Sequence, residues 1–178
     1  MYFKNKDSLL LGCGFSGAPI EASDLTVKDA FYATLESVVD QCSKRDTLRV
    51  LGDFNASTGN ERNVYETCFG PHGSGTVNQN STNFHDFARS DGLRVAGLRF
   101  QHPQAHRWTW YSTAGGVAKE IDHVLVDGHE TMIQNCRVYR SVQFLNTEHW
   151  LAVATLKLQL NPENGTIAAE AGCWQVQG

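Results

Sequence analysis

Hydrophobic and polar positions follow two periods along the chain, and the change of period separates a helical segment from a β-rich one. In KDAFYATLESVVDQC hydrophobic residues recur three and four positions apart from Phe31 to Val39, which predicts an amphipathic helix over residues 27–42. Thr26 and Asp29 have the spacing of a capping box at its start. A second, shorter helix is predicted over residues 83–90, before the turn signal Asp91-Gly92.

Runs of β-branched and aromatic residues make up most of the remaining chain. Strands are predicted at residues 8–13 and in LRVLG, LRVAGLRF, RWTWYS, EIDHVLVD, NCRVYRSVQF and HWLAVATLKLQL, with turn signals such as Gly115-Gly116 between them. The segment 57–82 is rich in Gly, Asn, Ser and Thr and has no periodicity. A connection of that length in a compact domain is usually functional or mobile.

Composition narrows the class of protein. A chain of 178 residues with 41% hydrophobic content suits one globular domain, because this length buries roughly 70% of the unfolded surface. We place the domain at residues 1–160 and expect the aperiodic residues 161–178 to be a disordered tail. No apolar stretch reaches 18 residues, so no membrane partner is expected. The net charge of −4 confines any nucleic-acid binding to a local patch or a metal ion.

Cysteine usage bears on the cellular compartment. The five cysteines are an odd number without CxxC spacing, which argues against a disulfide framework and a structural zinc site. We expect an intracellular location, nuclear or cytoplasmic, where thiols stay reduced.

Two local motifs have simpler explanations than the function they suggest. Residues 12–17 match the GxGxxG pattern of dinucleotide-binding folds, but Ala18-Pro19 follows where a helix should begin. His102 and His106 are four residues apart, as helical zinc ligands would be, but Pro103 breaks a helix between them. We interpret both histidines as loop residues.

Four motifs in a fixed order are more specific: Gly52-Asp53-Phe54-Asn55, Trp108-Thr109-Trp110, Ile121-Asp122-His123 and Thr147-Glu148-His149. Singly, each is explained by a turn or by core packing. Together they resemble the endonuclease/exonuclease/phosphatase superfamily. The phrases QNCRVYRS and LAVATLKLQL look closer still to the endonuclease domain of non-LTR retrotransposon reverse-transcriptase polyproteins, and to host relatives of the craniofacial development protein 2 type.

The resemblance implies an α/β (α+β) fold, a two-sheet sandwich with flanking helices, lacking the family's N-terminal strands. It implies a site at the strand ends, where Asp53 acts as general base and metal ligand and Asn55 donates to a phosphate oxygen. His149 would contact the scissile phosphate, and Asp122 would orient its ring. Thr109 matches a strand beside the substrate, where its hydroxyl would reach a phosphate.

The same resemblance implies the partner and the cofactor. DNA would be the substrate, and Mg²⁺ or Mn²⁺ would be held by Glu148 and Asp53. Glu148 stands where the family has Asp, and a carboxylate displaced by about an ångström can cost on the order of a hundredfold in rate. Gly17 stands where the family has a catalytic tyrosine, and the strands that carry the family's metal-binding Glu are missing. We therefore expect weak metal binding.

Two hypotheses follow. The first is a Mg-dependent phosphodiesterase that is weakly active or inactive in this chain. The second is a non-catalytic remnant or binding module that keeps only the fold. Since the missing strands would uncover part of one sheet, we also expect poor solubility or self-association.

Overall fold

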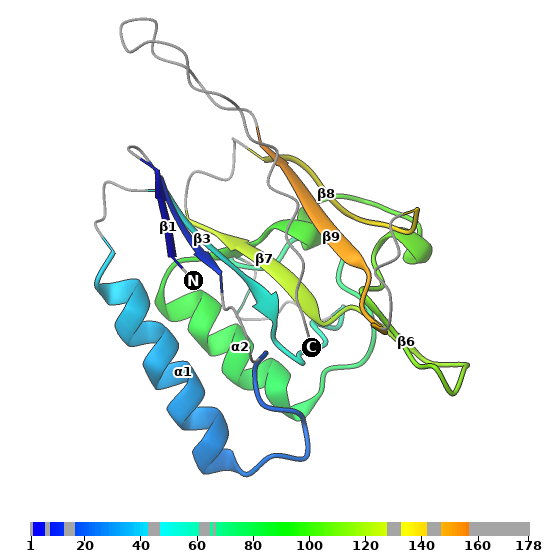
Figure 1. The fold of residues 1–178 in the computed structure, drawn as a ribbon, viewed down its shortest axis with the longest axis horizontal. Coiled ribbons are helices and arrows are strands. Elements are labelled where there is room, and N and C mark those ends of the chain that lie inside the picture. Colours follow the sequence, from blue (N-terminus) through cyan, green and yellow to red (C-terminus); the bar gives the residue numbers. More distant parts are fainter. Residues whose placement is uncertain are drawn as a thin grey trace, which may run out of the picture.

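The computed structural model describes residues 2–5, 8–12, 17–42, 47–60, 65, 67–127, 133–141 and 147–156 (Figure 1). The helices are α1 (Leu25–Asp40) and α2 (Gln79–Ser90), with short 3-10 helices η2 (Ala96–Arg99) and η3 (Gln104–His106). The strands are β1 (Tyr2–Asn5), β2 (Ser8–Gly12), β3 (Thr47–Asp53), β4 (Arg94–Val95), β5 (Trp110–Tyr111), β6 (Ala118–Lys119), β7 (Asp122–Val126), β8 (Ile133–Tyr139) and β9 (Leu151–Leu156).

A five-stranded sheet with the order β1-β2-β3-β7-β4 forms the centre of the molecule. Strands β2 and β3 run parallel, whereas the other neighbours are antiparallel. The hairpins β5-β6 and β8-β9 form two further two-stranded sheets. Both helices lie side by side on one face of the central sheet (Figure 1).

The core explains why β7 is buried along its whole length. On the helix-covered face, Leu125 packs with Val50 of β3 and with the aromatic residues of α2. On the opposite face, Val124 and Val126 pack against the β8 residues Ile133 and Cys136. A strand covered on both faces needs no polar alternation, and each of its five residues is buried. This layering confirms the predicted fold class of a sandwich with flanking helices.

The predicted helices exist, but their starts differ. Helix α1 begins two residues earlier than expected, and its N-cap is Asp24, which makes no side-chain cap hydrogen bond, so the capping box of Thr26 and Asp29 is wrong. Helix α2 begins four residues earlier than predicted, because Asn78 and Ser81 form a reciprocal capping box. This cap places the last part of the predicted long loop inside the helix.

Three other expectations need comment. The predicted strand LRVAGLRF is wrong beyond Val95, because the chain turns there into η2. Strand β1 was not predicted, and it pairs with β2 at one edge of the central sheet. The tail at residues 161–178 lies outside the described residues, as do Cys13 and Cys173.

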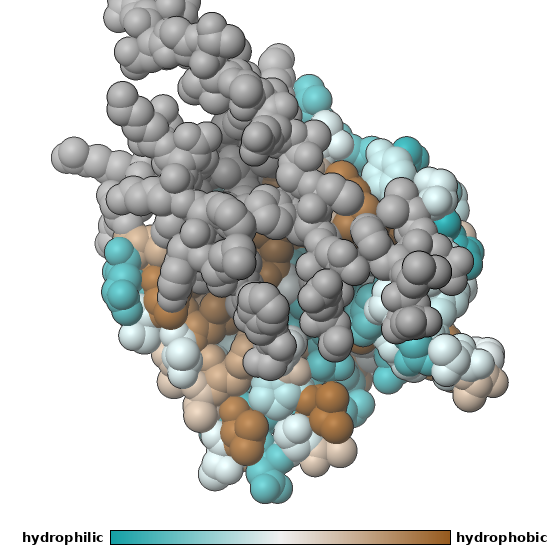
Figure 2. All heavy atoms as spheres, in the orientation of Figure 1, coloured by the Kyte–Doolittle hydropathy of each residue, from teal (hydrophilic) through white to brown (hydrophobic). Residues whose placement is uncertain are grey.

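The described surface carries a few exposed hydrophobic side chains. Ile20, Leu25 and Val27 are more than half exposed, and Figure 2 shows hydrophobic residues at the surface around the start of α1. Cys68 and Cys136 are buried free thiols. Among the described helices, none combines the length and the apolar character that a membrane span needs.

Candidate functional site

Two carboxylates face each other at one end of the central sheet. Asp53 ends β3 and Asp122 begins β7, and the two residues are direct partners in the antiparallel register. Side chains of directly opposed residues lie on the same face of a sheet, so the pairing alone brings the two acids together. Asp122 is buried, with 8% of its surface exposed.

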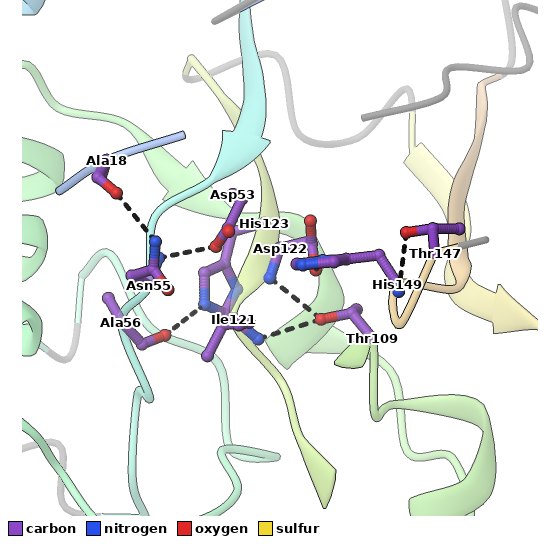
Figure 3. A network of polar contacts seen from close by, with 10 residues as sticks. All are labelled: Ala18, Asp53, Asn55, Ala56, Thr109, Ile121, Asp122, His123, Thr147 and His149. Atoms are coloured by element: carbon purple, nitrogen blue, oxygen red, sulfur yellow. Dashed lines mark hydrogen bonds and ion pairs between the residues drawn. The ribbon is translucent and has the colours of Figure 1, made fainter. Parts of the chain in front are cut away.

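His149 completes the grouping from a third segment, immediately before β9. Its Nδ1 lies 3.0 Å from Oδ2 of Asp122, and Figure 3 shows the ring directed toward the two carboxylates. One ring nitrogen of His149 and one oxygen each of Asp53 and Asp122 lie within 4.8 Å of one another. The structure therefore brings together three of the predicted site residues, which come from β3, β7 and the segment before β9.

The electrostatics of the grouping are strongly perturbed. Burial and the charge of Asp122 raise the pKa of Asp53 to about 6, against the opposing effects of the Asn55 N–H and of His149. Burial would lower the pKa of His149, but the hydrogen bond and charge of Asp122, with the charges of Asp53 and Glu148, outweigh it and raise that pKa. The neighbouring acids thus favour the protonated form of the His149 ring.

Asn55 lies beside the grouping, but its side chain is engaged. The residue has a φ of 47°, a left-handed conformation that asparagine tolerates better than most residues. Its Nδ2 donates to the carbonyl oxygen of Ala18 at 2.8 Å, and its backbone N–H donates to Oδ1 of Asp53. The bond to Ala18 occupies one of the two N–H groups on Nδ2, so only the second could donate to a phosphate, as predicted.

A strap formed by residues 17–19 crosses close to Asp53. The N–H of Ala18 donates to the carbonyl oxygen of Asp53 at 2.7 Å. A Cβ at Gly17 would lie 3.0 Å from both the Cβ and the carbonyl oxygen of Asp53. The position at which the resemblance implies a tyrosine is thus in contact with the proposed base, and a glycine allows that approach.

Glu148 is adjacent to His149 in sequence but is bound elsewhere. Its carboxylate accepts a hydrogen bond from the backbone N–H of Thr113 at the β5-β6 turn. Hydrogen bonds from Thr113, with a smaller one from Trp110, lower the pKa of Glu148. The three possible metal ligands that lie together are Asp53, Asp122 and His149, and Glu148 is not among them. This geometry does not support Glu148 as a partner of Asp53 in holding a metal.

Thr109 has a different position from the one predicted. Its hydroxyl oxygen accepts the backbone N–H groups of Ile121 and Asp122, each at 3.0 Å, and only 2% of the residue is exposed (Figure 3). A buried hydroxyl that faces the backbone of β7 is not placed to reach a phosphate. Thr109 instead fixes the start of β7, and with it Asp122.

The neighbouring predicted motif residues are structural. His123 is buried and stacks on Phe84, and its Nε2 donates to the carbonyl oxygen of Ala56 at 2.8 Å. Trp150, unusual after the final histidine motif, packs edge-on against Tyr111, and the Arg140 guanidinium lies over both rings. These contacts join β5 to the β8-β9 hairpin.

Two residues that sequence reasoning missed support the site from α2. Asn80, 2% exposed, donates through Nδ2 to the carbonyl oxygens of Pro19 and Asn55. Asn78 donates to the same Asn55 oxygen at 2.8 Å. The pattern Asn-x-x-Ser at residues 78–81 is a helix-start signal and would have located Asn78, but nothing in the sequence indicates the partners of Asn80.

Comparisons with known proteins identify sequence relatives and structures of similar fold. No family model matches the chain. Craniofacial development protein 2 from Tragulus javanicus is 28% identical over 131 residues, and the same protein from Bos taurus is 26% identical over 131 residues. Each match covers 73% of this chain and 22% of the relative. The chain therefore spans about a fifth of the length of these curated relatives.

Solved structures with a similar fold include a 3′ phosphatase, NExo from Neisseria, bound to a product DNA hairpin, with a TM-score of 0.65 and 17% identity. The match covers 88% of this chain and 64% of that one. The endonuclease domain of TRAS1, a telomere-specific non-LTR retrotransposon, matches with a TM-score of 0.58 and 13% identity, over 89% of this chain and 63% of that one. With the curated relatives, these structures support the assignment of the chain to the endonuclease/exonuclease/phosphatase superfamily.

Proposed function

We propose that the chain carries a metal-dependent phosphodiesterase site of the nuclease type, which acts on DNA and derives from a retrotransposon. The observation that carries this proposal is the grouping of Asp53, Asp122 and His149 at one end of the central sheet. NExo was solved with a DNA hairpin, and TRAS1 is a retrotransposon endonuclease. The NExo likeness favours DNA as the substrate class, and the TRAS1 likeness favours a retrotransposon as the source.

In the proposed reaction, Asp53 takes a proton from a water molecule that attacks the phosphorus atom. A pKa of about 6 leaves most of the carboxylate ionised at neutral pH while keeping it more basic than an exposed aspartate. The ring of His149, held by Asp122, stabilises the negative charge that develops on the phosphate oxygens, either through a hydrogen bond or as a ligand of a bound cation. The P–O bond to the leaving oxygen then breaks, and that oxygen keeps the bonding electrons and takes up a proton from solvent.

The donor atoms present fit a divalent cation. Carboxylates and imidazoles are common ligands of such ions. In this grouping, whose ligand atoms lie within 4.8 Å of one another, Asp53 and His149 would hold the ion and Asp122 would orient the ring of His149. Magnesium is the ion that the family resemblance implies. When bound, it would supply positive charge to the reacting phosphate.

We expect nicking of supercoiled plasmid at a rate barely above background. Asn55 and Glu148 are engaged by Ala18 and Thr113, and Gly17 has no side chain to contribute. The assay compares the unmodified chain with Asp53→Ala and His149→Ala in MgCl₂, and His102→Ala, outside the grouping, serves as the control. The proposal is supported if the unmodified chain and the control nick the plasmid slowly and both site variants do not nick it.

A non-catalytic binding module is the second candidate, favoured by the engaged side chains of Asn55 and Glu148. It predicts that the unmodified chain and Asp53→Ala nick plasmid equally slowly. It also predicts that both bind a fluorescent DNA hairpin with the same affinity in an anisotropy titration. That combination of results would reject catalysis by the chain.

A further inference from the structure

The donor set of the site differs from the one that the sequence predicts, and the difference bears on the identity of the metal. Sequence reasoning names two carboxylates, Glu148 and Asp53, which would give an all-oxygen site. The described part of the structure instead groups two carboxylates with the imidazole of His149. Glu148 is held by the N–H of Thr113. The site therefore offers oxygen, oxygen and nitrogen.

Magnesium is poorly matched to that set. It prefers oxygen ligands in near-ideal octahedral geometry and gives up its water reluctantly. Imidazole nitrogen suits the first-row transition ions, whose affinity for a mixed nitrogen and oxygen site rises from Mn²⁺ toward Cu²⁺, with Co²⁺ and Zn²⁺ above Mn²⁺. Exchanging a carboxylate for an imidazole therefore weakens Mg²⁺ binding more than Zn²⁺ or Co²⁺ binding.

The contact between Asp122 and His149 has the form that metal-binding histidines commonly show. A ligating imidazole usually presents its second ring nitrogen to a carboxylate, which fixes the tautomer and the ring orientation. Here Nδ1 lies 3.0 Å from Oδ2 of Asp122, and only 19% of the His149 side chain is exposed. Asp122 in turn is fixed by the buried hydroxyl of Thr109.

We infer that the grouping of Asp53, Asp122 and His149 binds a first-row transition dication such as Zn²⁺ or Co²⁺ in preference to Mg²⁺. The inference rests on the proposed function only in that it concerns the same site. It makes Asp53 and His149 the ligands, with Asp122 holding the ring of His149.

The test is calorimetric titration of the full chain with ZnCl₂, CoCl₂ and MgCl₂ separately. We expect Zn²⁺ and Co²⁺ to bind at least about tenfold more tightly than Mg²⁺. Asp53→Asn and His149→Ala should remove the tight binding, and Asp122→Asn should weaken it by about 10 to 100-fold. His102→Ala, which changes a histidine bonded to Asn135 outside the grouping, should bind as the unmodified chain does.

The absorption spectrum of the Co²⁺ complex excludes binding by cysteine. Ligation by oxygen and nitrogen gives ligand-field bands in the visible range without the near-ultraviolet charge-transfer band of a thiolate. Equal affinity for Mg²⁺ and Zn²⁺, retention of tight Zn²⁺ binding by His149→Ala, or a thiolate band would overturn the inference. Tight Zn²⁺ binding without nicking would reject the proposed function but support this inference. Nicking in Mg²⁺ together with weak Zn²⁺ binding would support the proposed function but reject this inference.

Discussion

At the scale of single residues, the site depends on how closely backbone segments approach Asp53. The strap at Gly17 and Ala18 contacts Asp53, and Asn55 is bonded to both Asp53 and Ala18. A carboxylate that is fixed from two sides has few orientations open to it. Small changes of side-chain volume at the strap should therefore reach Asp53 directly.

Gly17→Ala tests this contact. The new Cβ would lie 3.0 Å from two atoms of Asp53, so either the strap or Asp53 must move. Overpacking of this kind costs about 1 to 3 kcal/mol of unfolding free energy, which urea denaturation measures. Gly97→Ala is the matched control, because its Cβ would meet Glu120 at an ordinary 3.5 Å. Equal destabilisation by the two variants would contradict the close approach at Gly17.

Thr109→Val tests the assignment of Thr109 to the support of Asp122. The substitution keeps the shape of the side chain and removes the oxygen that accepts the N–H groups of Ile121 and Asp122. Leaving buried donors without this acceptor should lower the free energy of unfolding by about 1 to 3 kcal/mol. Thr34→Val, at an exposed helix position, should change it by less than about 0.5 kcal/mol. A neutral Thr109→Val would favour an exposed, substrate-facing hydroxyl.

At the scale of elements, the two helices differ in how they begin. Asn78 caps α2 in a reciprocal box with Ser81, and its side chain also contacts the backbone of Asn55 and Ser57. Asp24 at the start of α1 makes no side-chain cap bond. The start of α2 therefore anchors the loop that follows β3, whereas the N-cap side chain of α1 makes no such bond.

Asn78→Ala and Asp24→Ala form a matched pair. Loss of an N-cap side chain costs about 0.5 to 2 kcal/mol, and Asn78 should lie at the upper end because it also loses the bond to Asn55. Asp24→Ala should change the free energy of unfolding by less than about 0.5 kcal/mol. Thermal or urea unfolding of both variants measures these changes in unfolding free energy. A larger loss for Asp24→Ala than for Asn78→Ala would contradict the assignment of Asn78, and not Asp24, as a capping side chain.

Elements whose burial leaves a pattern in the sequence could be predicted, whereas elements that depend on tertiary packing could not. Helix α1 and the strands with long hydrophobic runs, such as β7 and β9, were predicted because their periodicity reflects burial. The strand expected after Val95 failed because the 3-10 turn of η2 depends on tertiary packing rather than on local pattern. The meeting of Asp53, Asp122 and His149 followed from motif order, whereas the side-chain directions of Glu148 and Thr109 depend on partners that no local pattern shows.

At the scale of the whole molecule, the helix-covered core contains buried histidines as well as apolar residues. His85 is 5% exposed, its ring centroid lies 4.4 Å from that of Phe69 and 4.9 Å from that of Tyr65, and within the described structure its Nε2 has no hydrogen-bond partner. Burial lowers the pKa of His85 to about 4 and also lowers the pKa of His123. Burial therefore favours the neutral form of both rings in the folded state.

The sign of the resulting pH dependence follows from proton linkage. Below about pH 6.5 the unfolded chain protonates His85, while the folded chain resists protonation until about pH 4, so stability falls as the pH drops through this window. The raised pKa of Asp53, about 6, acts in the opposite direction, because the folded chain then binds a proton that the unfolded chain has released. A pH titration of the unmodified chain alone would therefore mix the two effects.

His85→Leu isolates the contribution of His85 to the pH dependence of the unfolding free energy. Leucine fills a similar volume among the same aromatic rings and cannot be protonated. We expect the unmodified chain to lose about 1 kcal/mol more unfolding free energy than His85→Leu between pH 7.5 and pH 5. The contribution of Asp53 is common to both proteins and cancels in the difference. Urea denaturation at the two pH values measures it, with the pH 7.5 pair correcting for altered packing. Parallel losses in the two proteins would show that the ring of His85 is protonated as easily in the folded chain as in the unfolded one.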